Sequence, residues 1–74
     1  MTNSPQPIVI QSPYIALGQF LKLADIIASG GEAKAYLATE EVIIDGVIDQ
    51  RRGRKLYPGT IVKTSGKTFI VVEP

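Results

Sequence analysis

The sequence contains no cysteine, no histidine and no tryptophan. Without cysteine the chain can form neither a disulfide nor a thiolate–metal site. Without histidine it lacks the usual metal ligand and the usual general base near neutral pH. A nucleophile–base pair would then have to rely on a lysine, and no pattern in the sequence indicates a buried one. We therefore expect no cofactor and no enzymatic activity.

Long hydrophobic runs are also absent, and no segment approaches the ~20 apolar residues needed to cross a bilayer. Residues 1–7 are polar, contain two prolines and lack the basic start and apolar run of a signal peptide. They predict a loose tail. We expect a cytoplasmic protein with no membrane attachment.

The remaining residues, 8–74, predict a single domain near the lower size limit for a self-sufficient core. Hydrophobic residues make up 45% of the chain, so a core can form, with a stability margin of only a few kcal/mol.

Two helices are predicted from hydrophobic periodicity. A stripe at i, i+3, i+4, i+7, i+10 and i+11 predicts a helix over about residues 17–28. Its members are Leu17, Phe20, Leu21, Ala24, Ile27 and Ala28. A second helix is predicted over about residues 30–39, with Ala33, Tyr36 and Leu37 facing inward and Lys34 facing outward.

The segment between the helices, Ser29-Gly30-Gly31-Glu32, has the pattern of a capping box. In that arrangement the Ser29 hydroxyl accepts from the Glu32 amide, and the Glu32 side chain accepts from the Ser29 amide. The two glycines leave the backbone amides of the helix start uncovered, so an anion could approach them closely. The alternative is a tight turn between two closely packed helices.

The other segments predict short strands. Residues 8–10 are β-branched and lie between prolines, which predicts an edge strand. Asp45-Gly46 between two apolar segments predicts a hairpin with a type I′ turn. Further strands are predicted at residues 60–63 and 68–72. The fold class is therefore α+β, with two short helices packed on a small twisted antiparallel sheet.

Gly66-Lys67-Thr68 invites comparison with a phosphate-binding P-loop, but the pattern fails. That motif needs a glycine five residues before Gly66, where this chain has Ile61, and a helix where it has a predicted strand.

Charge is distributed unevenly along the chain. Residues 1–49 carry two lysines against six acids, whereas residues 50–72 carry six basic residues and no acid. Four of those cations lie in the segment Arg51-Arg52-Gly53-Arg54-Lys55, called the basic segment below. A clustered positive field attracts polyanions whatever the net charge. The alternative is a solvated turn rich in charge.

If both helices pack on one side of the sheet, their lysines and the basic segment converge beside the glycine-rich helix start. Arginine suits such a site because its planar fork meets phosphate oxygens bidentately. The candidate residues for binding a phosphate backbone are Lys22, Ser29, Gly30, Gly31, Lys34, Arg51, Arg52, Arg54 and Lys55. The chain has only five aromatic residues, mostly at predicted core or turn positions. This composition favours contacts to backbone and shape over the stacking of splayed bases.

Residues 17–62 resemble the S4 RNA-binding domain, which has the alpha-L fold, and especially the short bacterial proteins that consist of this domain alone. The resemblance is carried by LGQFLKLADIIASGGEAKAYLA, VIIDGVID, RRGRKL and YPGTIV. It implies binding to structured RNA, either ribosomal or transfer RNA. By position, Lys34 matches a helix residue that commonly faces RNA, and the basic segment matches a basic loop. The chain departs from the family at Gly30, where many members carry arginine, and at Thr60, where an acid is usual.

These observations predict a non-enzymatic, monomeric module that binds structured RNA, with ribosomal RNA, transfer RNA or ribosomal particles as its partners. Two alternatives remain open. One is an adaptor whose basic face docks an acidic protein, and the other is an auxiliary module of an RNA-modifying enzyme.

Overall fold

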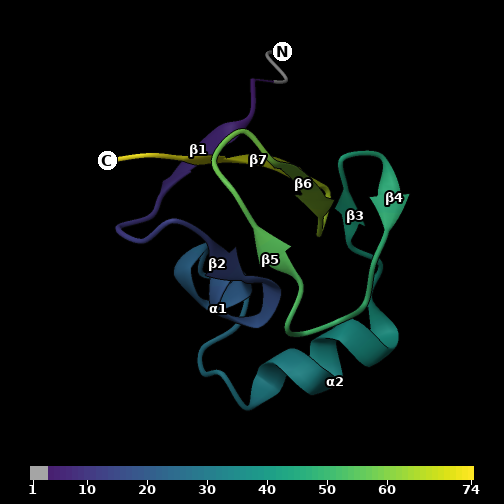
Figure 1. Ribbon diagram of the computed structural model, residues 1–74. Helices are drawn as coiled ribbons and strands as arrows, with labels where there is room; N and C mark the ends of the chain where they lie inside the picture. Colours follow the sequence, from purple (N-terminus) through teal and green to yellow (C-terminus); the bar gives the residue numbers. More distant parts are fainter. Residues whose placement is uncertain (1–3) are drawn as a thin grey trace.

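The computed structural model describes residues 4–74 and contains two helices and seven strands over that range. The helices are α1 (Leu17–Leu23) and α2 (Glu32–Thr39). The strands are β1 (Gln6–Val9), β2 (Ile15–Ala16), β3 (Ile43–Ile44), β4 (Val47–Ile48), β5 (Lys55–Leu56), β6 (Ile61–Thr64) and β7 (Lys67–Val72). In Figure 1 the two helices lie together on one side of the molecule, and most of the strands lie on the other.

The strands form two sheets. The larger has the order β1-β7-β6-β3-β4, and the smaller is the antiparallel ribbon β2–β5. The predicted α+β class is confirmed, but the larger sheet is mixed, because β1 runs parallel to β7 with Ile8 opposite Val71. Residues 8 and 9 do form part of an edge strand, as predicted. That strand begins at Gln6, so it includes two residues placed in the tail, while residues 1–3 lie outside the described range.

The core lies where the helices meet the sheets. Phe20 of α1 packs edge-on against Phe69 of β7, with ring centroids 5.6 Å apart. Leu21 and Leu37 are both buried, which confirms the predicted inward faces of the two helices. Lys34 is exposed on the outer face of α2, also as predicted.

The first helix is shorter than predicted because a Schellman motif ends it after Leu23. Asp25 adopts the left-handed conformation with φ of 63°. Its amide donates to the Lys22 carbonyl, and the Ile26 amide donates to the Leu21 carbonyl, which is the hydrogen-bond pattern of that motif. Ile27 is still buried after the turn, whereas Ala28, the last member of the predicted stripe, is exposed.

The predicted capping box at the start of α2 is half formed. A carboxylate oxygen of Glu32 accepts from the amides of Ala28 (2.8 Å) and Ser29 (3.0 Å). The Ser29 hydroxyl does not cap the helix; its main-chain carbonyl accepts from the Glu32 amide instead. Gly31 occupies the cap position in a helical conformation, so Ser29 lies two residues before the position from which a side chain could cap the helix.

Two hairpins in the larger sheet have turns with positive φ at both central residues, as type I′ turns require. Asp45 and Gly46 form the predicted turn between β3 and β4. The Asp45 carboxylate also accepts from the Ile61 amide, which ties this turn to β6. Ser65 and Gly66 form the turn between β6 and β7, so the sequence that was compared with a P-loop is a hairpin.

No helix within residues 4–74 is long and apolar enough to cross a membrane.

Candidate nucleic-acid interface

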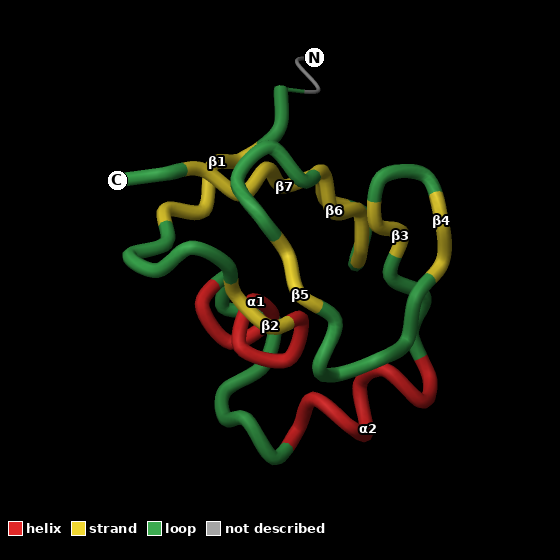
Figure 2. Tube along the Cα trace, viewed as in Figure 1, coloured by secondary structure: helices red, strands yellow, loops and turns green. Residues whose placement is uncertain are grey.

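The basic segment is fixed to the start of α1 by main-chain hydrogen bonds. The amides of Leu17 and Gly18 donate to the carbonyls of Arg54 (2.8 Å) and Arg52 (2.9 Å). Amides in the first turn of a helix have no partner within the helix, and no side chain caps α1. The carbonyls of the basic segment therefore supply the missing acceptors. Figure 2 shows this loop running from β4 past α2 and up into β5.

Gly18 makes this close approach possible. A methyl group at Gly18 would lie 2.8 Å from Cγ of Arg52 and 3.4 Å from Cβ of Ala33 in α2. The absence of a side chain thus allows the basic segment and α2 to pack against the same point of α1.

Asp49 holds the basic segment from its other end. Its carboxylate accepts from the Arg51 amide (2.8 Å), from Nη2 of Arg51 (2.7 Å) and from Nη1 of Arg54 (2.7 Å). Asp49 is only 8% exposed, whereas the side chains of Arg51 and Arg54 are 74% and 31% exposed. Hydrogen bonds from Arg51, followed by those from Arg54, hold the pKa of Asp49 well below its ordinary value despite its burial. The same contact raises the pKa of Arg51.

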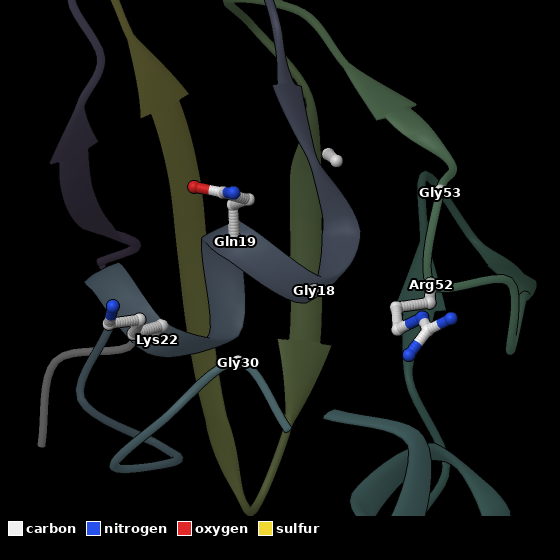
Figure 3. A pocket seen from close by; sticks show the side chains of 7 residues that line it. Gly18, Gln19, Lys22, Gly30, Arg52 and Gly53 are labelled. Atoms are coloured by element: carbon white, nitrogen blue, oxygen red, sulfur yellow. The ribbon is translucent and has the colours of Figure 1, made fainter. Parts of the chain in front are cut away.

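The side chain of Arg52 takes no part in this pairing and lines two adjacent hollows in the surface. One hollow, of about 310 Å³, is lined by Ala16, Gly18, Gln19, Lys22, Gly30, Arg52 and Gly53. Figure 3 shows Lys22 and Arg52 on opposite sides of it, with Gly30 between them. The other, of about 340 Å³, is lined by Lys34, Leu37, Ala38, Gln50 and Arg52. Arg52 therefore joins the lysine of α1 to the lysine of α2 across one continuous surface.

The structure brings together some of the nine candidate residues more closely than others. Lys22, Gly30, Lys34 and Arg52 line the two hollows, while Ser29 and Gly31 are exposed in the adjoining turn without lining either. Arg51 and Arg54 surround Asp49.

Lys55 is directed elsewhere, since its ammonium group lies 5.0 Å from the ring centroid of Tyr14.

Sequence reasoning missed Asp49, which it counted only as one acid of the first 49 residues. An acid two and five residues before arginines, at the end of a strand, could have indicated a turn closed by ion pairs. Thr60, at the position where the family usually has an acid, is buried and its hydroxyl accepts from the Tyr57 amide at 3.2 Å. This hydroxyl closes the turn before β6.

The described residues, 4–74, contain no group of three or more acidic, cysteine or histidine side chains positioned to hold a metal ion. They present instead a surface of cations beside exposed glycines, which suits a ligand with several separated negative charges.

Comparison with known proteins identifies the family of the chain. The family model for the S4 domain matches residues 8–72. The probable ribosome maturation protein RlbA of Bacillus subtilis is 55% identical over 60 residues, which are 81% of this chain and 84% of that protein. The putative RNA-binding protein YbcJ of Escherichia coli is 33% identical over 60 residues, 81% of this chain and 86% of that protein. On this evidence the chain belongs to the S4 domain family, whose model matches most of the sequence.

Proposed function

We propose that this protein is a non-enzymatic module that binds structured RNA through the surface on which Lys22, Lys34 and Arg52 meet. The name of the Escherichia coli relative supports RNA as the ligand. The name of the Bacillus subtilis relative, a probable ribosome maturation protein, supports ribosomal RNA in an assembling particle as the target.

The observation that carries this proposal is the position of Arg52. Its main chain is fixed to α1, and its exposed side chain lines the hollows of both Lys22 and Lys34. Within residues 4–74 the structure pairs no carboxylate with these three cations. A phosphate backbone crossing from one hollow to the other would meet all three.

The remaining cations of the basic segment have different roles in this proposal. Arg51 keeps most of its side chain in solvent, so it can contact a phosphate while it holds Asp49. Arg54 is mainly a structural partner of Asp49, because its side chain is less exposed and its carbonyl caps α1. We therefore expect Arg52 to contribute more to RNA affinity than Arg54.

A salt titration with matched charge variants tests the proposal. Lys22→Gln/Arg52→Gln removes two cations from the proposed surface. Lys63→Gln/Lys67→Gln removes two from the region of the β6–β7 hairpin, beside Glu40 and Glu41. Each phosphate contact contributes roughly 0.7–0.9 to the slope of log K against log salt. The first variant should flatten the slope for a ribosomal RNA hairpin by about 1.5, and the second should leave it close to that of the wild type.

Equal slopes for the two variants would refute the proposed surface. A wild-type protein with no salt-dependent binding to ribosomal RNA, transfer RNA or duplex DNA would instead favour an adaptor that docks an acidic protein.

A further inference from the structure

The two-stranded ribbon β2–β5 carries an aromatic pair that the helical surface does not include. Ile15 pairs with Leu56 and Ala16 with Lys55, so the same register places Tyr14 opposite Tyr57. Their ring centroids are 5.7 Å apart with the planes inclined by 50°, and the Lys55 ammonium group lies over the Tyr14 ring. We call Tyr14, Lys55 and Tyr57 the tyrosine patch.

This patch faces solvent because strand side chains alternate between the two faces of a sheet. Leu56 is fully buried and Ile15 packs against the core, so the residues on either side of them in sequence point outward. Tyr14 is 40% exposed and Tyr57 is 51% exposed. These two rings are not needed to fill the core. The Lys55 ammonium group lies over the Tyr14 ring, so a flat ligand would stack on Tyr57 or displace Lys55 from Tyr14.

The patch continues into the hollow that contains Lys22 and Arg52. Ala16 lies on the same face of the ribbon as Tyr14, about 7 Å along the strand, and it lines that hollow. On the other strand, Gly53 of the hollow precedes Lys55 by two residues. A chain of nucleotides could therefore place one phosphate in the hollow and an adjacent base on the tyrosines.

We propose that the tyrosine patch stacks one unpaired base of the RNA whose neighbouring phosphates lie in the hollow of Lys22 and Arg52. This inference rests on the proposed function and narrows its ligand to structured RNA with an unpaired nucleotide beside the helix, as in a bulge or at an end. Aromatic side chains accept any base by its π face. When a base displaces it from the Tyr14 ring, the Lys55 ammonium group is free to pair with the flanking phosphate. The sequence alone argued against base stacking, because it could not show that two of the five aromatic residues are paired on the surface.

The test uses an RNA hairpin that carries a single unpaired 2-aminopurine, either as a bulge or as a 3′ overhang, beside the same hairpin with a blunt end. The wild-type protein should bind at least one of the unpaired forms more tightly than the blunt form, and stacking should quench the 2-aminopurine fluorescence. Tyr57→Ala should reduce affinity for that form by about 5- to 100-fold, with little change for the blunt hairpin. Tyr57→Phe keeps the ring and should retain the preference.

Tyr14→Ala provides an independent variant on the other strand and should show the same selective loss. Thermal melting shows that each variant is folded before its affinity is compared. The slope of log K against log salt should not change in either tyrosine variant, because the phosphate contacts are retained.

Two failures can be told apart. Salt-dependent binding without a preference for an unpaired base, or without quenching, overturns the stacking site alone. Absence of salt-dependent binding to every hairpin overturns the proposed function itself.

Discussion

Asp49→Asn should weaken the fold by removing the charge that holds the basic segment. The Asp49 carboxylate accepts from one amide and two guanidinium groups. Hydrogen bonds to charged groups stabilise a fold by about 1.5–3 kcal/mol each. The Arg51 side chain is 74% exposed, so its ion pair is screened and contributes little. Asparagine can still accept from the Arg51 amide, so the loss is mainly the Arg54 pair, or about 1–3 kcal/mol.

That loss is large for a chain of this size, because small proteins are stable by roughly 0.05–0.15 kcal/mol per residue. For 74 residues this gives about 4–11 kcal/mol in total. The loss should appear at neutral pH as a lower midpoint in urea unfolding with an unchanged m-value.

The effect should also depend on pH. The pKa of Asp49 is lowered in the folded protein from its ordinary value of 3.8, so the ionised carboxylate stabilises the folded state. That stabilisation is complete above about pH 5 and is lost progressively as the pH falls through 3.8 and below. The difference in stability between wild type and Asp49→Asn should therefore narrow in acid.

Asp25→Asn is the control variant. It makes the same chemical change at an exposed carboxylate and should shift stability little, since asparagine also tolerates the left-handed conformation. Equal free energies of unfolding for wild type and Asp49→Asn at pH 7 would refute this role of Asp49. A difference between them that is the same at pH 7 and pH 3 would also refute it.

Three further substitutions test the packing that supports the site. Leu21→Ala and Leu37→Ala should each lower the free energy of unfolding by about 2–5 kcal/mol, because both side chains are buried. Melting temperatures close to that of the wild type in both variants would refute the assigned helix faces. Gly18→Ala should change stability by less than about 2 kcal/mol, since better helix propensity offsets crowding, yet it should weaken RNA binding by displacing Arg52. An RNA titration that matches the wild type would show that the close approach of Arg52 to Gly18 does not serve binding.

The features that the sequence predicted correctly are the local ones. The inward faces of the helices follow from spacing within each helix, and the Asp45-Gly46 turn follows from two adjacent residues that adopt positive φ readily. The early end of α1 was missed because aspartate, not glycine, occupies the left-handed position at residue 25. Nothing in the apolar spacing marks that turn, since Ile27 remains buried beyond it.

The features that the sequence did not predict depend on contacts between distant segments. The parallel pairing of β1 with β7 joins residues about sixty positions apart, and no local pattern specifies it. Counting charges along the chain treated the basic segment as four equivalent cations. In the structure the four cations have different contacts. Arg51 and Arg54 pair with Asp49, whereas Arg52 lines the hollows and Lys55 contacts Tyr14.

The two glycines before α2 had two interpretations in the sequence, an anion site or a simple turn, and the structure allows them to be separated. Neither glycine has positive φ, and a methyl group at either would meet no atom within 4 Å. Gly31 lies at the helix start with φ −67° and ψ −21°, so Gly31→Ala should stabilise the protein by about 0.4–1 kcal/mol by restricting the unfolded chain. Gly31 does not line the hollow, so RNA binding should be unchanged.

Gly30→Ala makes the same chemical change one residue earlier, where the residue lines the hollow with Lys22 and Arg52. If a phosphate occupies that hollow, the added methyl group should exclude one charge-assisted contact and weaken RNA binding by roughly tenfold. Because neither methyl group meets another atom, both variants should remain folded, and thermal melting checks this before titration. A difference in affinity between two alanine variants at adjacent positions therefore reports on the hollow and not on the turn. Equal affinities, both matching the wild type, would show that the segment is only a turn and that the phosphate lies nearer to Lys34.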